Sequence, residues 1–267
     1  MKSKKLVILY LTLLLIVMVT MISLNKNFSN NTRDYNEIYK EGILRVVTEY
    51  NQTGFFASGD TIQGFQYELS RAISDISGLE IQIFSEMSLS ESFAGLNDRR
   101  YDIIACNIPI TTEIKENYHF TDPVVLNKQV LIQRANDSIP PIRNQLDLAE
   151  KTLYIPEGSP ALLRIQNLRH EIGDTIYVVE EGLYSSEQLI IMVAKGDIDY
   201  AVCDRQIAIV AKEQFSEIDI ETDISFTQLQ AWAVRKESVT LLDSLNLWFG
   251  MIRDSGIYND IYKRYYK

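Results

Sequence analysis

The chain has 267 residues, of which 46% are apolar and 10% aromatic, and it contains only 12 glycines and 6 prolines. This composition excludes a disordered, collagen-like or low-complexity protein. The net charge is −10, but residues 1–26 hold four lysines and no acid, so the rest of the chain carries 22 basic and 36 acidic residues, a charge of −14. Such a body argues against nucleic acid or anionic lipid as a partner, because both are bound through clustered Lys and Arg.

The N-terminus has the pattern of an export signal. Lys2, Lys4 and Lys5 precede an uncharged run over residues 6–22. Three interpretations of residues 1–23 remain open: a cleaved signal peptide, an uncleaved membrane anchor, and a buried helix. The positions of Met21 and Ser23 do not make a small-residue cleavage site, and no cysteine follows for lipid attachment. In the first two interpretations the lysines stay inside and the acidic body is periplasmic or otherwise extracytoplasmic, with the inner membrane contacted through the N-terminal helix.

Residues 24–41 are polar and rich in asparagine, and we expect them to form a linker. From Gly42 onward the chain alternates short apolar runs with segments of helical periodicity. The predicted strands cover residues 44–47, 81–84, 102–105, 128–132, 152–155, 175–179, 200–203 and 230–234. One predicted helix follows Gly64. The other predicted helices cover residues 90–96, 160–168, 186–195, 206–214, 241–252 and 257–265.

A repeated signature suggests two related halves. Asp102 to Asn107 (DIIACN) and Asp199 to Asp204 (DYAVCD) share their spacing, and each follows a helix and a polar turn. The alternation predicts an α/β fold with doubly wound sheets flanked by helices, in two lobes rather than one. Ligands of open α/β sheets lie beyond the carboxyl ends of the strands, so we expect Asn107 and Asp204 to face a shared cleft.

A series of short motifs in a specific order carries a family resemblance. The segments are GILRVVT at 42–48, GFQYEL at 64–69, YDII at 101–104, ITTE at 110–113, FTDP at 120–123, EGS at 157–159, KGDID at 195–199 and SGIY at 255–258. Residues 42–267 thereby resemble the type II periplasmic solute-binding proteins of bacterial extracellular family 3, in the branch that binds polar amino acids. The Tyr67-Glu68-Leu69 segment is similar to the solute-binding half of membrane-bound lytic transglycosylases. Because Lys267 falls within the binding module's terminal helices, we expect no catalytic domain.

The resemblance implies two lobes that close on a ligand about a hinge. Lobe 1 would comprise residues 42–132 and 229–267, and lobe 2 residues 133–228. The hinge would lie near Leu131–Arg134 and Leu229–Trp232.

The resemblance also implies binding residues, each with an alternative structural role. Asp204 would hold the ammonium of a ligand or cap the following helix. Gly158 and Ser159 would present backbone N–H and hydroxyl groups to a carboxylate, although Ser159 before Pro160 equally fits a helix cap. In the loop after the first strand, Glu49 adds an acid, and Tyr50 and Phe56 are candidates to stack on the ligand or to pack on their own lobe.

Two expected carboxylate anchors are missing. The family's carboxylate-binding arginine corresponds to Ile114, and a backbone N–H donor to the same carboxylate corresponds to Pro109, which has no N–H. Lys115 is one residue away, about 100° around a helix, and does not substitute directly. We therefore expect weak binding of a standard free α-amino acid and a preference for amines or neutral polar ligands over anions.

Three functions follow as alternatives. The first is a non-catalytic solute-binding protein for transport or sensing, with an ABC transporter permease or another envelope protein as partner and a ligand that could derive from the cell wall. The second is an enzyme similar to cyclohexadienyl dehydratases, with a cleft carboxylate as general acid. The third is a ligand-free envelope scaffold related to the regulatory domains of lytic transglycosylases.

The chain offers little material for other site chemistry. Cys106 and Cys203 are predicted to be small buried strand residues, with a disulfide in a closed state as the alternative. His119 and His170 have no partner at ligand spacing, so the sequence predicts no metal and no cofactor.

Overall fold

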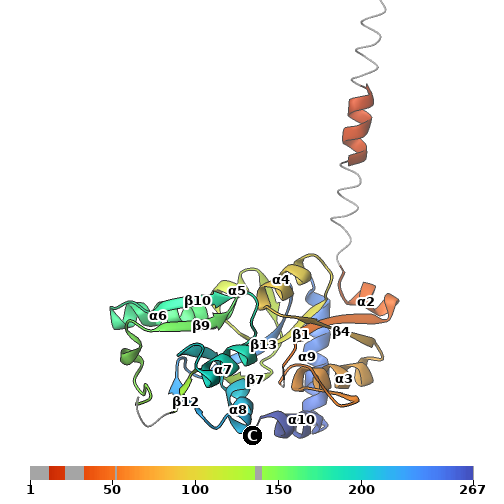
Figure 1. The fold of residues 1–267 in the computed structure, drawn as a ribbon. Coiled ribbons are helices and arrows are strands. Elements are labelled where there is room, and N and C mark those ends of the chain that lie inside the picture. Colours follow the sequence, from red (N-terminus) through yellow and green to blue (C-terminus); the bar gives the residue numbers. More distant parts are fainter. Residues whose placement is uncertain (1–11, 22–32, 52, 136–139, 267) are drawn as a thin grey trace, which may run out of the picture.

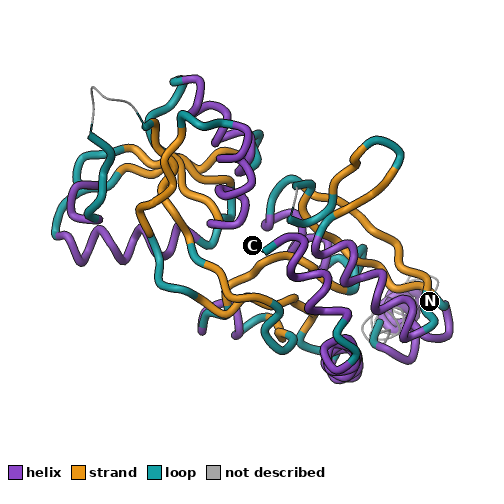
Figure 2. The backbone as a smooth tube through the Cα atoms, turned by 90° about the horizontal axis from the view of Figure 1, so that it is seen from below, coloured by secondary structure: helices purple, strands orange, loops and turns teal. Residues whose placement is uncertain are grey.

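The computed structural model describes residues 12–21, 33–51, 53–135 and 140–266. Residues 33–266 form two α/β lobes, and the chain passes between them twice (Figures 1 and 2). Residues 12–21 form a further helix. Among the described residues, no helix combines the length and the apolar character that crossing a membrane requires. Residues 1–11 and 22–23 of the predicted signal or anchor lie outside the described part of the chain.

Lobe 1 is built on a mixed sheet in the order β4-β1-β5-β13-β6, with β7 also paired to β13. The first three strands are parallel, and β13 runs antiparallel to β5, β6 and β7. The strands are β1 (Ile43–Glu49), β4 (Glu80–Glu86), β5 (Ile103–Pro109), β6 (Tyr118–Phe120), β7 (Val125–Asn127) and β13 (Gln228–Arg235).

Helices cover both faces of this sheet. One face packs on a large core around the fully buried Trp232, to which four helices contribute. These helices are α2 (Tyr35–Glu41), α3 (Phe65–Ser77), α9 (Val239–Asp254) and α10 (Ile257–Tyr265). The other face packs against α4 (Leu89–Asn97) through Leu89 and Leu96. Two small elements, the β2–β3 hairpin (Phe56–Ser58 and Thr61–Gln63) and α5 (Thr112–Lys115), complete the lobe.

Lobe 2 has the same layered plan. Its sheet has the order β10-β9-β11-β8-β12, with one face on α7 and α8 and the other on α6. Its strands are β8 (Gln129–Arg134), β9 (Thr152–Pro156), β10 (Tyr177–Glu181), β11 (Ala201–Asp204) and β12 (Ile218–Asp223). Its helices are the 3-10 turn η1 (Gln145–Leu148), α6 (Ala161–Ile172), α7 (Ser186–Lys195) and α8 (Arg205–Gln214).

The predicted α/β alternation and the two-lobed fold are confirmed, and every predicted strand and helix from residue 42 onward is present with boundaries shifted by a few residues. The elements that the sequence pattern did not indicate are α2, the β2–β3 hairpin, α5, η1, β6, β7 and β12. Most of them have too few residues to display a hydrophobic period.

The predicted polar linker is corrected at its C-terminal end. Residues 35–41 form α2, which opens with a capping box between Asp34 and Glu37 and buries Ile38 completely. Arg33 donates to both carboxylate oxygens of the fully buried Asp102, at 2.8 and 3.2 Å. A single buried apolar residue gives no periodicity, which is why the segment looked like a spacer, although the capping-box spacing of Asp34 and Glu37 is itself a helix signal.

The predicted lobe boundaries and hinge are also corrected. All of β8 pairs within lobe 2, with β11 and β12, whereas β7 pairs with β13 in lobe 1. The first crossing therefore lies at Lys128, ahead of the predicted Leu131–Arg134, and the return crossing lies in residues 224–227, ahead of Leu229–Trp232. The side chain of Asn127 accepts a hydrogen bond from the backbone N–H of Lys128 at 2.9 Å, at the point where the chain leaves lobe 1.

Candidate functional site

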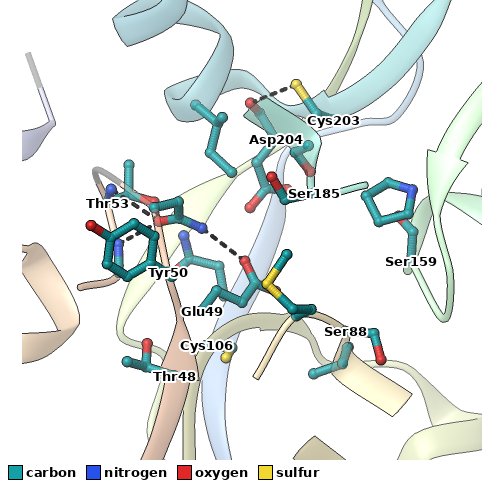
Figure 3. A pocket seen from close by; sticks show the side chains of 18 of the residues that line it. Thr48, Glu49, Tyr50, Thr53, Ser88, Cys106, Ser159, Ser185, Cys203 and Asp204 are labelled. Carbon is teal, nitrogen blue, oxygen red and sulfur yellow. Dashed lines mark hydrogen bonds between the residues drawn. The ribbon is translucent and has the colours of Figure 1, made fainter. Parts of the chain in front are cut away.

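A cleft lies between the two lobes, at the carboxyl ends of strands from both sheets. It encloses about 910 Å³ of space, which includes solvent at its mouth. Lobe 1 contributes residues after β1, β4 and within β5, and lobe 2 contributes residues after β9, β10 and β11. Figure 3 shows Glu49, Tyr50 and Cys106 on one side of this space, with Asp204, Cys203 and Ser185 on the other. The position agrees with the rule that open α/β sheets bind ligands beyond their strand ends.

Most of the residues proposed from the sequence meet in this cleft. Glu49, Tyr50, Asn107, Ser159 and Asp204 all line it. Gly158 and Phe56 are not among the lining residues: Gly158 sits next to Ser159 at the mouth, and Phe56 lies in the β2–β3 hairpin, paired with Gln63.

Asp204 ends β11 and precedes α8, but its side chain makes no capping hydrogen bond to that helix. It instead accepts a hydrogen bond from Nε2 of Gln129, the first residue of β8. The pKa of Asp204 is raised to about 7, chiefly by burial and then by the nearby Glu49 carboxylate, while the amides of Gln129, Gln230 and Asn107 lower it in part. The carboxylate is thus held in the cleft without a cationic partner.

Glu49 is positioned by the loop that follows it. Asn51 donates to Oε2 of Glu49 at 2.9 Å, and its own Oδ1 accepts from the backbone N–H groups of Thr53 and Gly54 at 3.1 and 2.6 Å. Burial raises the pKa of Glu49, the Asn51 amide lowers it, and the charge of Glu187 raises it. A Cβ on Gly54 would approach the carbonyl oxygen of Glu49 to 2.5 Å, so this tight loop requires glycine.

The lining of the cleft is strongly acidic. Besides Glu49 and Asp204, the carboxylates of Glu86, Glu157 and Glu187 line it, whereas none of the described lining residues is Lys, Arg or His. These three glutamates were not among the binding residues predicted from the sequence. Only their positions could have indicated them, because each lies at or just after the end of a strand or at the start of α7, where βα loops face the ligand.

A chain of buried amide and ring contacts connects the cleft with the core of lobe 1. Trp232 Nε1 donates to Gln66 Oε1 at 2.6 Å, Gln66 Nε2 donates to Asn107 Oδ1 at 2.8 Å, and Asn107 Nδ2 donates to the Tyr266 hydroxyl at 2.9 Å. Tyr265, the neighbour of Tyr266, accepts through its backbone carbonyl from Gln206 of lobe 2. The C-terminal helix therefore supports the floor of the cleft and contacts both lobes.

The Gly158-Ser159 corner is already occupied by groups of the protein itself. The backbone N–H of Gly158 lies 3.4 Å from the Glu180 carboxylate, and that of Ser159 donates to the Pro156 carbonyl at 3.1 Å. The Ser159 hydroxyl accepts from the backbone N–H of Ala161 at 3.3 Å, which is a helix-capping contact. The Glu180 carboxylate thus contacts the backbone N–H of Gly158, which the resemblance assigns to a ligand carboxylate.

The two missing anchors in lobe 1 are also explained by packing. Ile114 lies in α5 and packs against the apolar cluster that holds α4 to the sheet, and it does not line the cleft. Pro109 ends β5 opposite Gln230 of β13. The residue that replaces the expected arginine thus stabilises the lobe core instead of facing the ligand space.

The two cysteines are free, and each is nearly buried in a wall of the cleft. Burial raises the pKa of both thiols well above the usual value, and the carboxylates nearby raise it further. Both side chains are therefore protonated and weakly nucleophilic. Within the described residues, no group of three or more His, Cys, Asp or Glu side chains is arranged to hold a metal ion.

Comparison with known proteins agrees with this geometry. The model of the bacterial extracellular solute-binding proteins, family 3, matches residues 44–267. A membrane-bound lytic murein transglycosylase F from Desulfosudis oleivorans is 29% identical over 230 residues, which cover 86% of this chain and 50% of that protein. The same-named protein from Photobacterium profundum is 24% identical, with 89% of this chain and 46% of that protein covered. The chain therefore spans about half the length of these curated relatives.

Solved structures share the fold at low sequence identity. An ancestral arginine-binding protein bound to arginine superposes with a TM-score of 0.74 at 23% identity, covering 85% of this chain and 99% of that one. An ancestral amino-acid-binding protein described as a precursor of cyclohexadienyl dehydratase gives 0.74 at 21% identity, covering 87% and 99%. At these identities the likeness shows the fold alone.

Proposed function

Because the chain belongs to the bacterial extracellular solute-binding proteins, family 3, we propose that it is a non-catalytic binding protein whose lobes close on a small, polar, amine-bearing ligand. The observation that carries this proposal is the facing pair Glu49 and Asp204, one from each lobe. The pKa of each is raised, and no cation stands among the described lining residues to neutralise them. A positively charged ligand would relieve both the desolvation and the mutual repulsion.

The proposed setting is extracytoplasmic, with residues 1–23 acting as a signal peptide or a membrane anchor. A chain tethered by an anchor suits sensing, and a chain released by cleavage suits delivery to a transporter permease. The likeness to lytic transglycosylases makes a cell-wall-derived amine one candidate ligand.

A thermal-shift screen of the protein against cationic, neutral and anionic metabolites and muropeptides tests the proposal. We expect stabilisation by amine-bearing compounds, confirmed as heat in isothermal titration. Stabilisation by anions alone would contradict it, and stabilisation by no compound would favour the ligand-free scaffold.

A second candidate, a dehydratase, rests on one observation. A cleft carboxyl whose pKa is about 7, such as Asp204, has the acidity that a general acid needs at neutral pH. The acidic lining opposes this alternative, because the substrates of cyclohexadienyl dehydratases carry carboxylates that would need a cationic anchor. Incubation with prephenate and arogenate decides between the two, since turnover would establish the enzyme and its absence together with amine binding would support the binding protein.

A further inference from the structure

The charges that line the cleft indicate which charges its ligand carries. The inference that follows rests on the binding function proposed above. We infer that the ligand is a small aliphatic dication without a carboxylate, such as a diamine or an amine with a guanidinium group, which places one cationic end at Glu49 and the other at Asp204.

Negative charge is distributed over both lobes of the cleft. Glu49 ends β1 in lobe 1, and Asp204 ends β11 in lobe 2. The charge of Glu49 raises the pKa of Asp204, and the charge of Glu187 raises that of Glu49. A single ammonium can neutralise one of these carboxylates, whereas two positive centres are needed to neutralise both walls.

A buried amide, that of Gln230, also lies beside the Asp204 carboxylate. Gln230 is completely buried, and neither its Nε2 nor its Oε1 has a hydrogen-bond partner within the described structure. It nevertheless lies close enough to Asp204 to lower the pKa of that carboxyl. Gln230 does not line the cleft, so it acts on a ligand only through the Asp204 carboxylate, whose ionised form it favours.

A ligand carboxylate would need groups that donate to it. The lining amides are engaged, since Asn51 donates to Glu49, Gln66 to Asn107, Asn107 to Tyr266 and Gln129 to Asp204. The corner at Gly158 holds the carboxylate of Glu180. A ligand carboxylate would therefore meet the carboxylates of Glu49 and Asp204, and none of the described lining residues is a cation that could bind it, so like charges would repel each other across the cleft.

The remaining wall suits an alkyl chain. Met87 and Tyr50 line the cleft from lobe 1 and are half exposed, and Ile207 lines it from α8 in lobe 2. Apolar surface of this kind packs against methylene groups, while the acids bind the charged ends.

Two pairs of probes that differ by one carboxylate test the inference. Cadaverine is decarboxylated lysine and agmatine is decarboxylated arginine, so isothermal titration of all four compounds isolates the effect of the carboxylate. We expect each decarboxylated member to bind at least about tenfold more tightly than its amino acid. Equal or tighter binding of lysine or arginine would overturn the inference while leaving an amine-binding protein in place. No binding by any amine would contradict the proposed function itself.

Variants test whether both ends are used. Glu49→Gln and Asp204→Asn should each weaken cadaverine binding by about tenfold or more, whereas Glu213→Gln, which removes an exposed charge of α8, should leave it unchanged. Butylamine, a single cation of similar chain length, should lose affinity through only one of the two cleft variants. If either cleft variant, shown to be folded by circular dichroism, bound cadaverine like the native protein, the two-ended arrangement would be wrong.

Discussion

Replacing Asp204 with asparagine should stabilise the ligand-free protein while abolishing tight binding. Asparagine retains an oxygen that can accept the hydrogen bond from Gln129, but it carries no charge to desolvate. The substitution also removes the repulsion that Asp204 and Glu49 exert on each other.

The magnitude follows from the pKa of the carboxyl. Its value rises from 3.8 to about 7 on folding, and each unit corresponds to about 1.4 kcal/mol, so the upper limit of the cost is about 4 kcal/mol. Solvent reaches the half-buried side chain, so we expect a gain of about 1–3 kcal/mol in the free energy of unfolding of Asp204→Asn at neutral to alkaline pH.

The sign of the pH dependence is fixed by the direction of the shift. Below about pH 4 both folded and unfolded carboxyls are protonated, and the variant should match the native protein. Between about pH 4 and 7 the unfolded state loses its proton while the folded state keeps it, so the stability of the native protein falls relative to the variant. Above that range the difference should be constant.

Urea unfolding of both proteins across this pH range provides the assay, with Asp197→Asn as a control because Asp197 is an exposed acid of the same lobe. A difference between Asp204→Asn and the native protein that does not change with pH would refute the reasoning, as would destabilisation at alkaline pH.

Three further outcomes are expected. Arg33→Ala should lower the free energy of unfolding by about 2–4 kcal/mol in urea titration, because it removes a partner of the buried Asp102, and an unchanged value would show that the segment before α2 is not part of the folded body. Gly158→Ala should weaken ligand binding, because Gly158 has φ +71° and a Cβ there would overlap Ser90 of the opposite lobe. Adding Ser90→Gly should restore part of the affinity. A double-mutant cycle that showed no coupling between the two positions would contradict this contact between the lobes. Binding of a cation should release protons near pH 7, and its affinity should increase as the pH rises from about 5 to 8, because the cation favours the ionised form of Asp204. Calorimetry in buffers of different ionisation enthalpy measures this proton exchange. Proton uptake on binding would contradict the expectation.

The sequence was sufficient for the fold because the signals that define it are long and periodic. The apolar stripe of α9 and the buried strands β1, β5 and β11 can each be read from spacing alone, and the two D-x-x-x-C segments located the cleft. The hinge was misplaced because the predicted strand over residues 128–132 was assigned to lobe 1, whereas β8 pairs with β11 and β12 of lobe 2, and strand pairing cannot be read from the local sequence.

The site could be predicted only in part, for a physical reason. Glu49 and Asp204 end β1 and β11, Tyr50 follows β1, Asn107 lies in β5 and Ser159 lies in the loop after β9, so the predicted strands already indicated where these residues lie. Two features could not be predicted: that Glu187 lines the cleft, and that the Glu180 carboxylate contacts Gly158. Both depend on how loops distant in the sequence come together, which the local sequence pattern does not encode. The sequence predicts that Ile114 departs from the family's pattern, but only the packing shows that it lies against the core of lobe 1.

The most direct test of the central claim is a crystal structure of the protein with cadaverine at saturating concentration. The account predicts lobes closed on the diamine, one ammonium at the Asp204 carboxylate and the other at Glu49, with the methylene chain against Tyr50 and Met87. A diamine bound outside the cleft, or a cleft that closes on lysine with its carboxylate held between the lobes, would contradict it.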